Sequence, residues 1–136
     1  MAGAEYELQK AMDTVLKADA ALAGLVAGRI YDRVPPSAKY PYIQIGEGNA
    51  VSDRMDCLRS WTVYASIHVW SIDVGFGEAK RIMGAVDDCL DGAALQLETL
   101  RLIFCISYKS QVFRDADGLT SHGIVEFRAV IEKRTA

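Results

Sequence analysis

The chain has 136 residues, of which 51% are hydrophobic and 24% charged, a length and balance typical of one domain around one buried core. Its formal net charge of −3 argues against a protein that binds nucleic acid by coating phosphates with a basic patch. We therefore expect residues 1–136 to form a single domain that does not bind DNA tightly, although it can lie beside DNA.

The hydrophobic segments and the cysteines indicate in which cellular compartment the protein is made. No stretch approaches the roughly 18 apolar residues of a membrane span, and the N-terminal residues lack the regions of a signal peptide, so we expect a protein made in the cytoplasm without a membrane partner. Cys57, Cys89 and Cys105 are odd in number and widely spaced, which favours reduced thiols. The last two fall on apolar patterns and are interpreted as small buried hydrophobes.

The first third of the chain predicts a helix followed by a stiff connector. Between Glu5 and Ala27 apolar residues recur at helical spacing, and Asp19 is placed to cap a second, short helix. Pro35 and Pro36 force an extended connector, and Pro41 fits only the beginning or the edge of a strand. These constraints predict a first strand from Tyr42 to Gly46.

A loop and a second strand follow. Residues 47–60 combine Gly, Asn, Ser and Asp without a sustained period, which predicts a long loop that is mobile in the isolated chain. Residues 61–70 alternate strictly between two faces, the pattern of a strand. His68 falls on the more polar face, where we expect it at solvent or at an interface.

The second half predicts a helix and a hairpin. Residues 75–92 carry one apolar stripe and end at Gly92, as a surface helix does. Two long strands, 99–113 and 120–133, flank a turn at Asp117 and Gly118. The predicted fold is α+β with the order αββαββ: a four-stranded, mainly antiparallel sheet in the order 1-2-4-3, with two helices on one face.

No pattern in the chain predicts catalysis, a cofactor or a metal. His68 and His122 lie far apart in sequence without metal-ligand spacing, and the acids near Asp53 and Asp115 are typical of turns. The glycines from Gly75 match neither the dinucleotide nor the nucleoside triphosphate fingerprint.

Large apolar residues on both faces of the predicted sheet are unusual when helices cover only one face. They favour contact between subunits over scattered surface residues. The long loop between the first two strands has the length to reach a neighbour. The predicted interface residues are therefore Asp53, Arg54, Met55, Tyr64, Trp70, Phe113 and Val130.

The order and spacing of several segments resemble a known family. The N-terminal helix, the segment GRIYDRVPPSAKYPYIQIG, the strand end HVWS, the helix GFGEAKRIMGAVDDCLDG and the hairpin FRDADGLTSHGIVEFRAVIE are similar to the tail-completion, or tail-terminator, proteins of long-tailed phages and gene transfer agents. The resemblance covers residues 8–132. It brings no catalytic residues.

The resemblance implies a structural virion protein of the tail or neck, assembled in the host bacterial cytoplasm. Six copies would form a ring on the head-proximal end of the tail tube, stop polymerisation of the major tube protein and join the tail to the head-completion, or stopper, protein. DNA would pass through the channel without specific binding. Two alternatives remain open: a small-molecule-binding or enzymatic domain, and a monomeric protein-interaction module.

Overall fold

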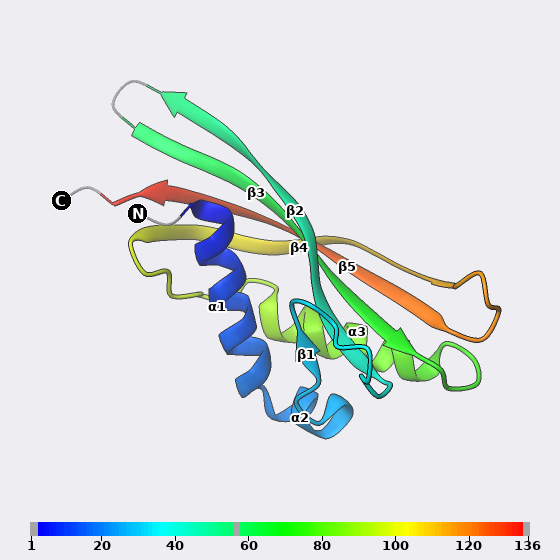
Figure 1. Cartoon of the computed structure of the whole chain (residues 1–136). Coiled ribbons are helices and arrows are strands. Elements are labelled where there is room, and N and C mark those ends of the chain that lie inside the picture. The colour runs from blue at the N-terminus through cyan, green and yellow to red at the C-terminus, as the bar shows by residue number, and fades with distance from the viewer. Residues whose placement is uncertain (1–2, 56–57, 135–136) are drawn as a thin grey trace.

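A computed structural model describes residues 3–55 and 58–134. Within these residues, three helices and five strands are arranged in two layers (Figure 1). The elements are α1 (Ala4–Ala18), α2 (Ala20–Val26), β1 (Ile30–Tyr31), β2 (Tyr42–Met55), β3 (Leu58–Ser71), α3 (Gly77–Leu90), β4 (Leu100–Arg114) and β5 (Ser121–Lys133).

The sheet is mixed, with five strands in the order β1-β2-β3-β5-β4. The four long strands are antiparallel neighbours and have the predicted order, so the α+β class and that part of the topology are confirmed. The prediction of only four strands was wrong, because β1 pairs in parallel with Ile43 and Gln44 of β2. Its two residues are too few to give an alternating pattern.

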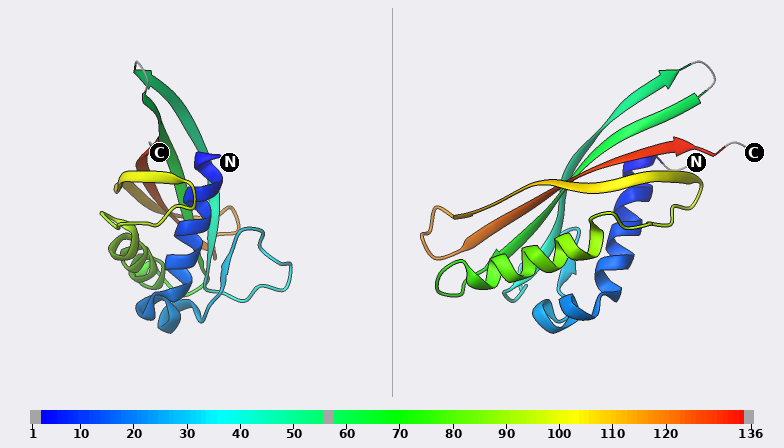
Figure 2. Two further views of the ribbon diagram at one scale, coloured as in Figure 1. Left: turned by 90° about the vertical axis from the view of Figure 1, so that its left-hand side faces the viewer. Right: turned by 180° about the vertical axis from the view of Figure 1, so that it is seen from behind.

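The helices all lie over one face of the sheet, which Figure 2 shows from two further directions. The short helix predicted after Asp19 is confirmed as α2, because the Asp19 side chain accepts a hydrogen bond from the Leu22 amide at 3.0 Å, so the predicted total of two helices was wrong. α1 and α3 pack their apolar stripes on the sheet. The largest fully buried side chains of this core include Leu8, Met12, Leu16, Ile67, Ile82, Leu90, Phe127 and Ile131.

The prediction of a long loop over residues 47–60 was wrong. β2 continues to Met55 and β3 begins at Leu58, so the two strands form a long hairpin that projects beyond the helices (Figure 1). The strand bulges between Ile45 and Gly48, and a side chain at Gly48 would meet the Tyr64 carbonyl oxygen at 2.5 Å. The glycine and small polar residues after Ile45 therefore belong to β2, whose backbone passes close to that of β3 at this bulge. Asp56 and Cys57, the centre of the predicted loop, lie outside the described residues.

A buried carboxylate ties α1 to the start of β4. Glu7 is 2% exposed, and it accepts hydrogen bonds from the Thr99 amide and hydroxyl, at 2.8 and 2.5 Å, and from the Leu100 amide, at 3.2 Å. Burial alone would raise the pKa of Glu7, but these hydrogen bonds outweigh it and lower the pKa below its ordinary value. The ion therefore fixes the position of α1.

Candidate interaction surface

The sheet face that carries no helix is the conspicuous surface of this protein, and we call it the bare face. Both views in Figure 2 place the helices on the opposite side. Two bulges in β4, at Leu102/Phe104 and at Ser107/Lys109, change which residues reach this face. They leave Phe113 there, opposite His122, whereas Ile103 falls within a bulge and is exposed.

An aromatic row crosses the bare face, with one ring from each strand. Its members, in sheet order, are Tyr31, Tyr42, Trp70, His122 and Phe113. Neighbouring ring centroids lie 6.0, 6.3, 3.8 and 4.9 Å apart, within or below the range of favourable aromatic pairs. Trp70 and His122 are nearly parallel, with 12° between their planes. β1 thus supplies one end of the row, and Tyr40 of the proline-containing connector packs against Tyr42, with ring centroids 5.2 Å apart.

A polar chain adjoins the row at His122. His122 Nε2 lies 2.6 Å from Nδ1 of His68, and Nε2 of His68 lies 3.0 Å from a carboxylate oxygen of Glu47. The bulge in β2 brings Glu47 to this position. His68 is only 8% exposed, so the expected position at solvent is wrong, whereas the alternative position at an interface stays a prediction.

The electrostatics of this cluster keep His122 neutral. Burial, followed by the nearby His68 ring, lowers the pKa of His122, although Asp115 and Glu47 act in the opposite direction. A hydrogen bond from its own backbone amide, aided by His68, lowers the pKa of Glu47. Burial raises the pKa of Tyr42 to about 12, with a further contribution from Tyr40. At neutral pH His122 and Tyr42 are therefore both uncharged.

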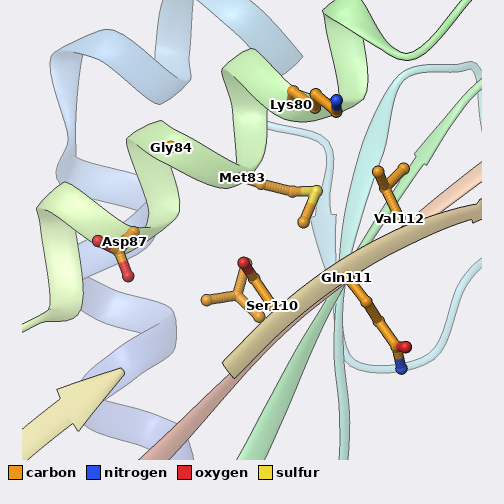
Figure 3. A pocket seen from close by; sticks show the side chains of 8 residues that line it. Lys80, Met83, Gly84, Asp87, Ser110, Gln111 and Val112 are labelled. Carbon is orange, nitrogen blue, oxygen red and sulfur yellow. The ribbon is translucent and has the colours of Figure 1, made fainter. Parts of the chain in front are cut away.

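Away from the bare face, a hollow lies between α3 and the outer edge of β4, with a volume of about 480 Å³ (Figure 3). Met83 and Asp87 of α3 are directed toward β4, whereas Gln111 points away from the helix. Gly84 contributes no side chain, and nothing lies within 4 Å of where its Cβ would be. We call this hollow the α3 groove.

Reactive chemistry is sparse across residues 3–55 and 58–134. They contain no group of three or more His, Cys, Asp or Glu side chains placed to hold a metal ion. Cys89 and Cys105 are free thiols, and burial raises the pKa of each to about 11, which disfavours the nucleophilic thiolate. Cys105 is buried as expected, but Cys89 is only partly buried. None of the described helices is long and apolar enough to cross a membrane.

The predicted interface residues fall into three places. Trp70 and Phe113 meet through His122 in the aromatic row. Tyr64 lies further along the bare face, against Tyr108, and Val130 lies opposite Thr62. The remaining three lie in the projecting hairpin: Asp53, Arg54 and Met55, of whose side chain nothing is described.

Sequence reasoning missed four of the seven residues in the aromatic row and the polar chain beside it. Tyr31, Tyr42, His122 and Glu47 were not predicted for this surface, although the alternation of β3 already placed His68 with Tyr64 and Trp70. The same period of two, applied to β5, puts His122 on the face of Val130. Glu47 gave no such signal because a bulge positions it.

The described residues form a small α+β domain with an aromatic row on one face of its sheet and a groove beside α3. The model of the tail completion protein gp17 family matches residues 10–132. The chain belongs to this family. It is a structural tail completion protein of a phage or gene transfer agent virion.

Similar proteins agree with this assignment. The tail completion protein gp17 of Bacillus phage SPP1 is 28% identical over 92 residues, which are 68% of each chain. A chain in the virion of a native gene transfer agent particle has 29% identity and a TM-score of 0.90, with 97% of this chain and 99% of that chain covered. The SPP1 gp17 structure has 27% identity and a TM-score of 0.64, with 98% and 94% covered.

Proposed function

We propose that six copies of this chain form a ring on the head-proximal end of the tail tube. The ring stops addition of tube protein and joins the tail to the head-completion protein. The observation that carries the proposal is the likeness, over almost the whole of both chains, to a component of a gene transfer agent virion.

The surfaces of the subunit support assembly by contact. A cyclic ring requires two different patches on each copy, which meet at every interface. The aromatic row and the projecting hairpin offer two such patches, which lie at opposite ends of β2 and β3 (Figure 1). We propose that Asp53, Arg54, Met55, Tyr64, Trp70, Phe113 and Val130 take part in contacts between subunits.

The charge of the chain suits a passage for DNA. A net charge of −3 gives no reason for DNA to bind tightly along the channel of a ring. In this proposal DNA passes without specific contacts. The ring assembles in the host bacterial cytoplasm and remains in the neck of the virion.

Electron microscopy of particles made without this protein tests capping directly. If the chain ends polymerisation, its loss gives overlong tails, tails without heads, or both. Complementation with the wild-type chain restores tail length and attachment. Tails of normal length, joined normally to filled heads in its absence, would rule the proposal out.

Single substitutions add a test of mechanism. His68→Ala, Cys57→Ser and Asp115→Ala variants that remain folded should retain tail completion, because no reactive side chain is required. A single substitution that abolishes completion without weakening folding or assembly would point instead to an enzyme.

A further inference from the structure

We propose that neighbouring copies join by strand pairing, in which the outer edge of β2 in one copy adds to the outer edge of β4 in the next, beside the α3 groove. This inference rests on the proposed ring and specifies the contact that closes it. The β2 segment is Gly48–Met55, here called the arm edge. The β4 segment is Tyr108–Arg114, here called the receiving edge.

Both edges are unpaired within the described chain. β1 covers β2 only at Ile43 and Gln44, so the arm edge has no strand on its outer side. Along β4, the turn after α3 covers an earlier part: the Gly92 amide donates to the Cys105 carbonyl at 2.7 Å, and the Ser107 amide donates to the Asp91 carboxylate at 2.9 Å. The receiving edge begins directly after this cover. Long free edges of this kind are templates for another strand.

The directions of the two strands permit this pairing. Three antiparallel ladders lead from β2 through β3 and β5 to β4, so β2 and β4 run in opposite directions. If the sheet continues from one copy into the next, the arm edge therefore meets the receiving edge antiparallel. The two edges belong to different strands, as the head-to-tail contact of a ring requires.

One register matches apolar side chains and keeps each on its own face. Val51, paired with Thr62, and Phe113, paired with His122, both lie on the bare face. They are 57% and 40% exposed, unusually high for large apolar side chains on a sheet. Placing Val51 opposite Phe113 covers both side chains, and it continues the apolar surface of the aromatic row into the neighbouring subunit.

The same register brings opposite charges together on both faces. It sets Asp53 opposite Gln111, diagonal to Lys109, on the bare face. On the helix side it sets Arg54 opposite Ser110, which lines the α3 groove together with Asp87. Asp53 of one copy thus approaches Lys109 of the next on the bare face, and Arg54 approaches Asp87 on the helix side.

The α3 groove leaves room for the incoming side chains. Gly84 is exposed in the interior of α3, where glycine is unfavourable for a helix, and its missing side chain keeps the groove open. Met83 and Val112 provide apolar walls. Side chains on the helix side of the arm edge, such as those of Ser52 and Arg54, would enter this space.

Thiol crosslinking on assembled tails tests the contact. In a Cys57→Ser background, one chain carries both Ser52→Cys and Ser110→Cys, and a short bismaleimide is added. We expect a ladder of covalent multimers up to the hexamer from the double variant. An equal mixture of the two single variants should give covalent dimers only, and each single variant alone should remain monomeric.

The outcomes separate the contact from the ring. Dimers from a single variant, or no multimers from double-variant tails on which electron microscopy shows rings, would overturn the strand pairing while leaving the ring intact. Tails on which this protein is a monomer would overturn both.

A second variant tests the groove. Gly84→Leu should preserve the folded monomer, because leucine favours a helix, but it should weaken self-association at least about tenfold by obstructing the arm. The matched control is Arg81→Leu, on the same helix outside the groove lining, and it should associate normally. Equal association of both variants would contradict docking at the groove.

Discussion

The two faces of the sheet are built in different ways. The helix-covered face is closed and mainly aliphatic, with Leu16, Ile67 and Ile82 fully buried, and its buried ion, Glu7, has its partners within the subunit. The bare face is aromatic and polar, and its row ends in the half-exposed Phe113. One face therefore completes its contacts in the monomer, whereas the other leaves apolar surface exposed.

This difference predicts where substitutions act. Changes on the helix-covered face should reduce the free energy of unfolding and affect assembly only through loss of folded protein. Changes at the ends of the aromatic row should leave folding nearly intact and affect assembly directly.

Phe127→Ala should be the most destabilising change. Phe127 is fully buried beneath the helices, and truncation of such a phenylalanine costs about 3–5 kcal/mol. Urea denaturation monitored by circular dichroism measures this loss. A cost below about 1 kcal/mol would mean that the helices do not close over this face as described.

Glu7→Gln should cost about 1–3 kcal/mol, because the carboxylate hydrogen bonds to Thr99 and Leu100 are weakened. The folded-state pKa of Glu7 is lowered, so its contribution is present above the ordinary pKa of 4.5 and disappears as pH falls through the folded value. The difference between wild type and variant should therefore shrink in acid. Glu5→Gln, an exposed change in the same turn, is the control, and a similar loss there would refute a specific role for Glu7.

His122→Phe should remove a pH dependence from the bare face. Because the folded-state pKa of His122 lies below its ordinary value of 6.5, the unfolded chain binds the proton more readily, and the wild type loses stability as pH falls below about 6.5. The variant should show a shallower decline in thermal melts across this range. Phe113→Leu alters the row without removing a titrating group and should keep the wild-type slope. Identical slopes for wild type and His122→Phe would remove His122 from the account.

Phe113→Ser should have the smallest effect on the monomer, within about 0.5 kcal/mol, because its ring is substantially exposed. It should nevertheless reduce assembly, since it removes an apolar side chain from the proposed contact. Chemical denaturation and tail completion are measured on the same preparation. Normal completion with Phe113→Ser would show that the exposed end of the row is not used.

Sequence patterns predicted the regular elements because burial imposes a period. The alternation of residues 61–70 and the Asp117–Gly118 turn set β3 and the β4–β5 hairpin with little ambiguity. The projecting hairpin was missed because its few apolar residues, such as Val51, do not alternate with polar ones over a sustained run. Such a strand is recognised only through its partner.

The candidate surface was harder to predict than the fold. Trp70 and Phe113 could be predicted because they are large apolar residues on the sheet face that the helices do not cover. Glu47 and Tyr31 were not, because a bulge positions the first and a two-residue strand the second. A bulge moves every residue beyond it to the other face of the sheet. The local sequence did not predict the two bulges in β4.

The mass and symmetry of this protein on isolated tails test the central claim most directly. Electron microscopy of the head-proximal tail end, with the number of copies measured by mass, should reveal six copies in a closed ring. Dissociation to monomers in free solution would be compatible with this result, since the tube can nucleate the ring. A monomer on assembled tails, or no copies at that end, would contradict the account.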